Sequence, residues 1–350
     1  MPEEQQDKET PVEEVKPQGP DEKELFAELD SFFQETAAKV TLRLQQILQS
    51  RQVSNLTDMA LYAVGSGKKL RPGLSILVYR SLFGNPTEEK HILDIASMAE
   101  LLHASSLIID NVVDSDKVRR GKTSAHILYG GAMSMVGAGS LFVLALKIGL
   151  SRSNEISGIA LQMAEDLING NEMDVVKIDF NHEQYYKMIE LKTVSLFVGA
   201  TRLGAIMANA MPPIKETCRL FGYHVGMAFQ IMDDLVDLYN SKASGMPTGC
   251  LLEAKPFLPL IHLYETNPEV RPLLERYRGG TQLSADEWEA LYRSLDEAGS
   301  VKYTEDIIEE HIKKAEDLIR TLPDNHYRKL MLVLPRYTQA AIRRDIASTI

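Results

Sequence analysis

Apolar side chains recur at helical spacing along most of this chain. Between residues 24 and 50, Leu25, Leu29 and Phe33 follow four-residue steps, which places them on one face of an α-helix. Strand signals, such as alternating β-branched runs between tight turns, are weak. The pattern predicts an all-α fold of ten or more helices around one core. Further helical stretches cover residues 72–81, 94–110, 154–171, 182–208, 214–238, 256–264, 285–299, 304–322 and 325–348.

The N-terminal end differs in composition from the rest of the chain. Residues 1–20 contain four prolines and six acidic side chains but no aromatic one, which predicts a disordered acidic leader over residues 1–21. This leader lacks the basic start and the apolar core of a signal peptide. We therefore expect a single helical domain over residues 22–350, in which residues 265–280 form an exposed connection.

One stretch is apolar enough to raise the question of a membrane span. Residues 127–146 carry no charge, and about 20 residues is the length that a helix needs to cross a bilayer. The stretch also holds four glycines and two serines, and it lacks the dense leucine and isoleucine of a strong span. We therefore expect a helix buried in the core or at a subunit interface, and no transmembrane segment.

Charge and cysteine content narrow the class of protein. The 350 residues include 38 basic and 49 acidic side chains, which gives a formal net charge of −11. This balance argues against non-specific nucleic-acid binding, which requires a basic surface. The two cysteines, Cys218 and Cys250, exclude a disulfide scaffold and favour a reducing compartment such as the cytoplasm. An acidic protein with an anionic substrate needs a local basic cluster.

Two of the predicted apolar helices end in acidic clusters. Asp110 and Asp114 lie four residues apart, and so do Asp233 and Asp237, with Asp234 beside them. Like charges at this spacing repel by roughly a few tenths of a kcal/mol, so a cation should compensate them. One such cluster is commonly a solvated helix end. Two of them, about 120 residues apart, favour Mg²⁺ held together with a diphosphate.

Three basic segments would complete a diphosphate site. The loop 64–72 combines two glycines with Lys68 and Arg71, so its backbone can approach a phosphate closely while two cations contact it. The other segments are Arg119–Arg120 and Lys192–Thr193. Each segment alone is more often plain surface charge. The loop lacks the GxxxxGK[ST] spacing of a P-loop.

Five strings of residues occur in a specific order. They are GKKLRP (67–72), LLHASSLIIDNVVDSDKVRRGK (101–122), KT (192–193), GMAFQIMDDLVDL (226–238) and KPFLPLI (255–261). With them, the chain resembles the trans-isoprenyl diphosphate synthases (the polyprenyl synthetase family), in particular the geranylgeranyl diphosphate synthases, from about residue 56 onward. The resemblance implies the isoprenoid synthase fold, an all-α bundle around a central cavity. It also implies a prenyltransferase that condenses isopentenyl diphosphate with an allylic diphosphate.

The resemblance assigns roles to individual residues. Mg²⁺ ions, three by the family pattern, would be held by Asp110, Asp114, Asp233, Asp234 and Asp237. Isopentenyl diphosphate would contact Lys68, Arg71, His103 and Arg120, and the allylic diphosphate would contact Arg119, Lys192, Thr193, Gln230 and Lys255. The residues expected to act most directly in catalysis are Arg119, Lys192 and Asp233. The resemblance further implies a homodimer, and a heteromer stays open.

Product length in this family depends on the fourth and fifth positions before the first aspartate. Here these positions are Ser106 and Ser105, and the next turn presents Leu102. Because both serines are small, no aromatic side chain closes the product pocket there. We therefore expect a product longer than farnesyl diphosphate, with the C20 geranylgeranyl diphosphate as the first expectation.

The sequence departs from the family pattern at several positions. Asn111 replaces an aspartate, Met246 replaces a lysine, and an aspartate is lost near Cys250, while Ala254 replaces a glycine and Ser140 an aspartate. A lost charge-assisted contact is worth very roughly 1.5–3 kcal/mol, on the order of one to two decades in rate. These departures keep two alternatives open: a non-catalytic or regulatory subunit of a heteromeric prenyl diphosphate synthase, and a terpene synthase on the same fold.

Overall fold

The computed structural model describes residues 20–50, 54–65, 67–84, 89–119 and 122–347. The acidic leader expected over residues 1–21 lies outside the described residues, apart from the two that begin the first helix. Arg120 also lies outside them, and the side chain of Arg119 is not described.

Sixteen α-helices account for most of the described chain. The first seven are α1 (Pro20–Gln49), α2 (Ser54–Val64), α3 (Leu70–Ser81), α4 (Glu89–Val113), α5 (Ala125–Tyr129), α6 (Gly131–Leu150) and α7 (Asn154–Val176). The others are α8 (His182–Ile189), α9 (Ser195–Met207), α10 (Pro212–Ser244), α11 (Gly249–Leu252), α12 (Leu258–Thr266), α13 (Arg271–Arg278), α14 (Ala285–Glu297), α15 (Ser300–Arg320) and α16 (His326–Ala347). The prediction of an all-α fold is confirmed.

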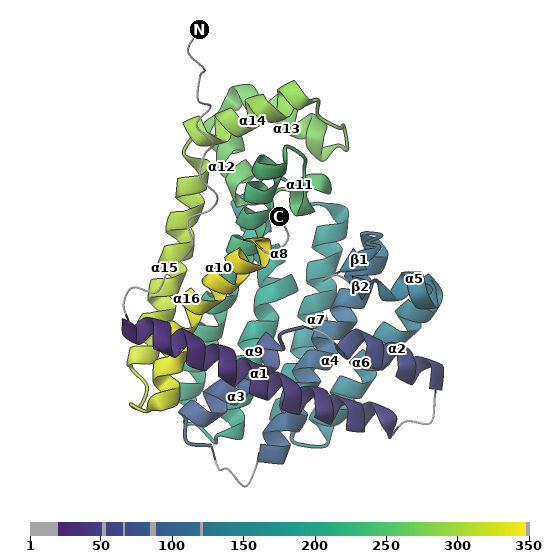
Figure 1. Cartoon of the computed structure of the whole chain (residues 1–350), viewed down its shortest axis with the longest axis vertical. Coiled ribbons are helices and arrows are strands. Elements are labelled where there is room, and N and C mark those ends of the chain that lie inside the picture. Colours follow the sequence, from purple (N-terminus) through teal and green to yellow (C-terminus); the bar gives the residue numbers. More distant parts are fainter. Residues whose placement is uncertain (1–19, 51–53, 66, 85–88, 120–121, 348–350) are drawn as a thin grey trace.

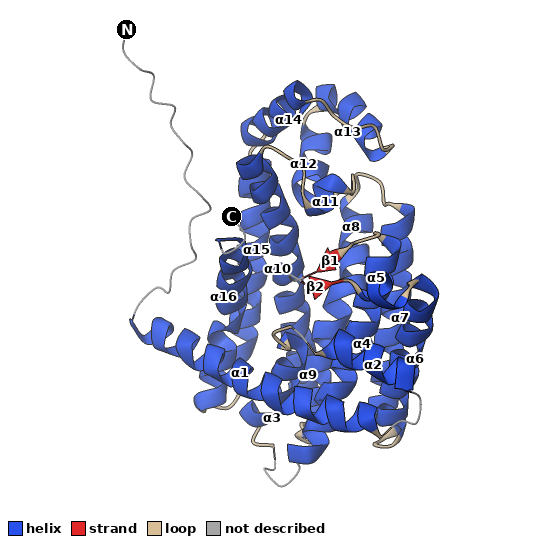
Figure 2. Ribbon diagram, turned by 45° about the vertical axis from the view of Figure 1, so that its right-hand side comes forward, coloured by secondary structure: helices blue, strands red, loops and turns tan. Residues whose placement is uncertain are grey.

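The long helices pack around α10, which contacts α9, α15 and α16. On the other side of the bundle α3 packs on α9 and α4 packs on α6. The short helices α11 to α14 gather at one end, and α1 crosses the outside of the bundle near the other end (Figure 1, Figure 2). Buried apolar side chains form two core clusters, and Phe229 of α10 packs against both. Helix α10 therefore joins the two halves of the interior.

Two short segments differ from the sequence-based expectation. A hairpin of β1 (Val118–Arg119) and β2 (Lys122–Thr123) follows α4, and strands of two residues are too short to show an alternating pattern. The segment 265–280, expected to be an exposed connection, is largely helical. A 3₁₀ turn, η3 (Pro268–Val270), is capped by the Asn267 side chain and leads into α13.

The uncharged stretch 127–146 is divided by Gly130, whose positive φ of 81° ends α5 before α6 begins. Among the described residues, α4 and α6 are the helices that are long and apolar enough to cross a membrane, and the apolar window is 83% buried in α4 but 33% buried in α6. The helix expected in the core or at an interface is therefore only partly buried within this chain. Its outer face exposes Met135, Val136 and Val143, which leaves the interface expectation as the alternative.

A pair of histidines joins α10 to α15 and predicts a pH-dependent stability. The Nδ1 atoms of His224 and His311 lie 2.9 Å apart, so one ring must donate to the other, and the contact fails when both are protonated. Burial lowers the pKa of each ring to about 4. Because the unfolded value is about 6.5, this stabilisation is present above about pH 6.5 and is lost as the pH falls toward 4.

Urea unfolding at pH 7 and at pH 5 measures this effect. The free energy of unfolding should be lower at pH 5 than at pH 7. This difference should be smaller in the double variant His224→Gln/His311→Gln. The charges of Lys314 and Glu310, which act on both histidines, are kept in this variant. Any pH dependence that these two residues cause by themselves therefore remains in both proteins. An equal fall in both proteins would show that the histidine pair does not carry the pH dependence.

Candidate active site

Asp110 and Asp114 lie one turn apart at the C-terminal end of α4. Their side chains are largely buried, at 13% and 16% exposure, although acidic side chains at the end of a helix are usually solvated. Asp110 Oδ1 lies 3.7 Å from Nζ of Lys192, and Asp114 Oδ1 lies 3.4 Å from Nζ of Lys255. The two ammonium groups supply the compensating positive charge that the sequence required.

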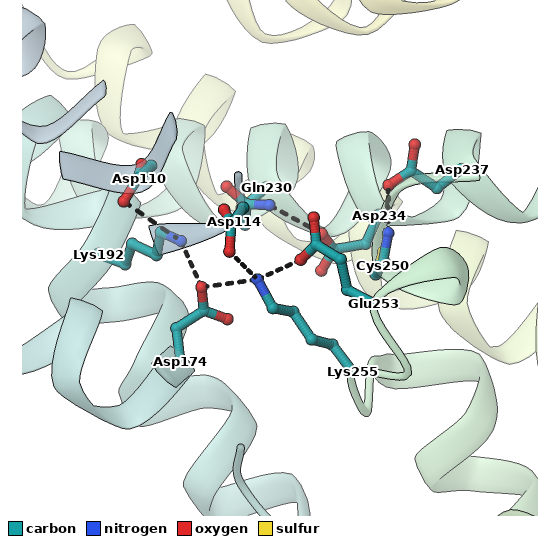
Figure 3. Close-up of polar contacts among 10 residues, drawn as sticks. All are labelled: Asp110, Asp114, Asp174, Lys192, Gln230, Asp234, Asp237, Cys250, Glu253 and Lys255. Carbon is teal, nitrogen blue, oxygen red and sulfur yellow. Dashed lines mark hydrogen bonds and ion pairs between the residues drawn. The ribbon is translucent and has the colours of Figure 1, made fainter. Parts of the chain in front are cut away.

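Asp174, near the end of α7, is the central carboxylate of the site and was missed by the sequence analysis. Its Oδ2 accepts from Nζ of Lys192 at 2.5 Å and from Nζ of Lys255 at 2.9 Å. Burial alone would raise the pKa of Asp174, but the two lysines outweigh it and hold the pKa below its usual value. Asp174 therefore ties together a helix and a loop that are distant in sequence (Figure 3).

Lys192 is placed by an irregular helix and a close crossing. Residues 182–208 are not one helix, as expected, but two, joined by a π-helical segment, η2 (Glu190–Val194), that contains Lys192. Such segments are frequent at functional sites. At Gly170 of α7, an added Cβ would lie 2.4 Å from the backbone nitrogen of Lys192. The glycine lets α7 approach η2 closely, one turn before Asp174.

Lys255 reaches the site from the loop after α11. Besides Asp114 and Asp174, it pairs with Glu253 of its own loop, a second carboxylate that the sequence analysis missed. Burial would lower the pKa of Lys255, but the surrounding carboxylates raise it above its usual value. Figure 3 shows its ammonium group between these three carboxylates. The lysine therefore stays charged and links the loop to α4 and α7.

The second acidic cluster lies on α10 and has a different environment. Gln230 accepts from Thr193 Oγ1 at 2.6 Å and donates to Asp234 Oδ1 at 2.8 Å, while Tyr185 donates its hydroxyl to Asp234 Oδ2 at 2.6 Å. Burial raises the pKa of Asp234 to about 7. Asp233, in contrast, is exposed. The hydrogen bonds that run from Thr193 through Gln230 to Asp234 connect η2 with α10.

Asp237 contacts the loop that follows α10. Its Oδ2 accepts from the backbone N–H of Cys250 at 3.0 Å and from Sγ of Cys250 at 3.2 Å. Burial raises the pKa of Asp237. The carboxylate thus holds the first turn of α11, and Figure 3 places it apart from the carboxylates around Lys255.

The residues expected to bind isopentenyl diphosphate are brought together only in part. Arg71 Nη1 lies 3.2 Å from His103 Nε2, and the guanidinium lies 5.0 Å from the centre of the Phe197 ring. Lys68 is exposed on the same loop. Arg119 and Arg120 cannot be placed here, because their side chains lie outside the described residues.

The residues expected to set product length are buried in α4. Ser105 donates its hydroxyl to the Ala138 carbonyl of α6 at 2.8 Å, and Ser106 donates to the His103 carbonyl at 2.9 Å. Leu102 is fully buried. These side chains do not line the cavity of about 270 Å³ beside the first acidic cluster. That cavity lies between α4 and α7 and is lined by Ile109, Asp110, Val113, Asp114, Ile168, Asn171, Glu172, Asp174, Val175 and Val176.

The donor set of this site fits a divalent cation such as Mg²⁺. Asp110, Asp114 and Asp174 offer only carboxylate oxygens, the ligands that Mg²⁺ prefers, and the ion is usually bound by one or two carboxylates together with water and substrate phosphates. Within the described ranges, no three His, Cys, Asp or Glu side chains already form a metal-binding group. Asp110 and Asp114 could supply two carboxylates to a cation that shares its other ligands with a diphosphate.

Comparison with known proteins extends over most of the chain. Residues 53–295 match the model of the family described as polyprenyl synthetase. The octaprenyl diphosphate synthase of Escherichia coli K12 is 29% identical over 320 residues, covering 86% of this chain and 93% of that protein. The geranylgeranyl diphosphate synthase of Methanosarcina mazei is 25% identical over 313 residues, covering 86% and 94%. A decaprenyl diphosphate synthase structure from Rhodobacter capsulatus aligns with a TM-score of 0.82 at 23% identity, covering 91% of this chain and 99% of that one.

Proposed function

This chain belongs to the polyprenyl synthetase family of trans-prenyl diphosphate synthases, and on that premise we propose that it joins isopentenyl diphosphate to an allylic diphosphate. The observation that carries the proposal is the meeting of Asp110, Asp114 and Asp174 with Lys192 and Lys255. Carboxylates that hold a metal and ammonium groups that bind phosphate are both required to stabilise a departing diphosphate.

The aspartates at the end of α4 and on α10 are the proposed Mg²⁺ ligands, namely Asp110, Asp114, Asp233, Asp234 and Asp237, and we propose three ions. When bound, Mg²⁺ would act as a Lewis acid that neutralises charge on the allylic diphosphate. Asp174 is proposed to hold Lys192 and Lys255 at the edge of the metal site, because it accepts from both.

The side chains around the metal would bind and orient the two substrates. Lys192 and Lys255, with Thr193, Gln230 and the undescribed Arg119, are proposed to donate to the allylic diphosphate as its bond to carbon breaks. Arg71, with Lys68, His103 and Arg120, is proposed to hold isopentenyl diphosphate. The buried aromatic ring of Phe197 beside Arg71 would help to exclude water from an allylic cation. No protein nucleophile is needed.

The product is proposed to be longer than farnesyl diphosphate, with the C20 product first. Ser105 and Ser106 lie about one turn before Asp110 on α4 and are small. Replacing Ser105 with phenylalanine should therefore shorten the product, because it places a large ring at a position that the family pattern assigns to the product pocket. Chromatography of the extracted products measures the length. An active variant with products of unchanged length would contradict the assignment, and thermal unfolding of the variant controls for damage to the contact between α4 and α6.

A second copy of this chain is the proposed partner. The outer faces of α6 and α7 expose Met135, Val136, Val143, Leu161 and Ile168, and an exposed apolar patch of this kind marks an interaction surface. We propose a homodimer through this face and a soluble, cytoplasmic protein. Sedimentation of the purified protein measures the mass of the assembly, and a monomer at micromolar concentration would contradict the proposal.

A non-catalytic partner subunit is the second candidate. Met246 is exposed, at 67%, at a position where the family pattern has a lysine. The backbone N–H and the thiol of Cys250 both donate to the carboxylate of Asp237. Both features remove groups that would otherwise face a substrate diphosphate.

One assay separates the candidates. Purified protein is incubated with Mg²⁺, labelled isopentenyl diphosphate and each allylic primer in turn, and the extended product is measured. Incorporation by this protein alone supports the synthase. Incorporation only after a second subunit is added supports the partner role, and conversion of the primer without isopentenyl diphosphate supports a terpene synthase.

A further inference from the structure

Lys69 lies between the two cations of the diphosphate-binding loop, but its side chain points into the protein. Lys68 is exposed, whereas the side chain of Lys69 is 1% exposed. Its Nζ donates to Oε1 of Glu100 on α4 at 2.7 Å and to the carbonyl of Val64, the last residue of α2, at 2.6 Å. Glu100 is likewise buried, with 6% of its side chain exposed. The ammonium group therefore ties the end of α2 and the start of α3 to α4.

The backbone at Lys69 is as unusual as its side chain. Its φ of 50° and ψ of 41° are left-handed, and it is the residue that precedes the first turn of α3. A side chain with a β-carbon is disfavoured in this region by roughly 1 kcal/mol or more, so something must hold the residue there. The two buried hydrogen bonds of its ammonium group do so.

Two contacts between α3 and α4 then lie one turn apart. Glu100 of α4 binds Lys69, and three residues later His103 contacts Arg71, with 3.2 Å between Nε2 and Nη1. Residues three apart on a helix lie on the same face. The ion pair thus sits directly beside the pair that is expected to bind a diphosphate.

We propose that the Lys69–Glu100 ion pair is a positioning pair that sets the affinity of the loop for isopentenyl diphosphate. The inference rests on the proposed function, because it names the loop as the site of that substrate. Burying two charges costs desolvation energy, and a pair of apolar residues in their place is often as stable. A gain in stability therefore does not by itself account for the pair, and we assign it the role of orienting Lys68 and Arg71.

This distinction sets the experiment. In Lys69→Met, Glu100 is left buried without its partner, so both thermal stability and isopentenyl diphosphate affinity should fall. In the double variant Lys69→Met/Glu100→Leu, no charge is left unpaired, so the melting temperature should return toward that of wild type. The KM for isopentenyl diphosphate should stay raised by about tenfold, equivalent to about 1.4 kcal/mol of binding. The KM for the allylic primer and kcat at saturation should be unchanged.

The matched control removes another ion pair between helices. Arg336 of α16 and Glu316 of α15 lie 2.8 Å apart at Nε and Oε1, and Arg336→Met/Glu316→Leu should leave the KM for isopentenyl diphosphate unchanged. Glu100→Gln, which keeps an acceptor for the Lys69 ammonium, should bind isopentenyl diphosphate more tightly than Glu100→Leu. That comparison tests the proposal even if the double variant does not fold.

Binding measured by calorimetry separates this inference from the proposed function. A folded double variant that binds isopentenyl diphosphate as tightly as wild type would overturn the positioning role. So would an equal rise in the KM of both substrates, which indicates general damage to the site. A wild-type protein that binds isopentenyl diphosphate but does not incorporate it would overturn the proposed function and leave the positioning role standing.

Discussion

Asp110→Asn is expected to lower the rate of isopentenyl diphosphate incorporation by on the order of 10²–10³-fold, the size of effect seen when a group that stabilises transition-state charge is removed. The substitution removes a carboxylate charge from a largely buried position, 3.7 Å from the ammonium group of Lys192. It weakens a proposed metal ligand and also removes one of the two carboxylates that face the Lys192 ammonium group. Both effects act on the departing diphosphate.

Steady-state rates at several Mg²⁺ concentrations measure this loss. If Asp110 is a metal ligand, the variant should need more Mg²⁺ than wild type to reach half of its own maximal rate. Glu297→Gln on α14 is a control, because Glu297 is an exposed acid that belongs neither to the site nor to the proposed dimer face, and its loss should leave the rate unchanged. A rate for Asp110→Asn that matches wild type at every Mg²⁺ concentration would remove Asp110 from the metal site.

The site residues that could be predicted from sequence are those that belong to a recurring spacing or to a short string of residues. Asp110 and Asp114 are four residues apart, which is a helical signal that needs no knowledge of the fold. Lys192 was found in a short basic segment, and Lys255 was found because it lies within a string that resembles a known family. In each case the prediction depended on neighbours in sequence, and the structure then brings these distant strings to one place.

Asp174, in contrast, is a single acid near the end of a helix. Its importance comes from two lysines that are 18 and 81 residues away, and no local pattern reports such a contact. A signal was available in Gly170, one turn earlier, since a glycine inside a long helix often marks a close approach of another backbone. Its value could be recognised only when the crossing segment was known.

Lys68 and Lys69 illustrate a different limit. The two residues are chemically identical and adjacent, yet one is exposed and the other is buried against Glu100. The direction of each side chain is decided by the left-handed backbone at Lys69 and by the position of α4, neither of which the composition of the loop reveals. The π-helical segment that carries Lys192 was also missed, because its apolar spacing resembles that of an ordinary helix.

Gly170→Ala is expected to impair both stability and activity, although it adds a single methyl group. The new Cβ would lie 2.4 Å from the nitrogen and 2.8 Å from the Cα of Lys192. These are backbone atoms, which cannot rotate away, so α7 and η2 must separate. Overpacking of this kind costs about 1–3 kcal/mol, and a shift of about 1 Å in a catalytic group can cost on the order of 10²-fold in rate.

Gly158→Ala on the same helix provides the control. A Cβ at Gly158 meets no atom within 4 Å, so alanine should be neutral there or stabilise α7 by up to about 1 kcal/mol. Urea unfolding and incorporation rates of the two variants therefore separate helix propensity from the close crossing. If Gly170→Ala behaved like Gly158→Ala in both measurements, the approach of α7 to η2 would not determine the position of Lys192. If instead its rate fell while its stability matched that of Gly158→Ala, the crossing would act on the placement of Lys192 and Asp174 rather than on the fold.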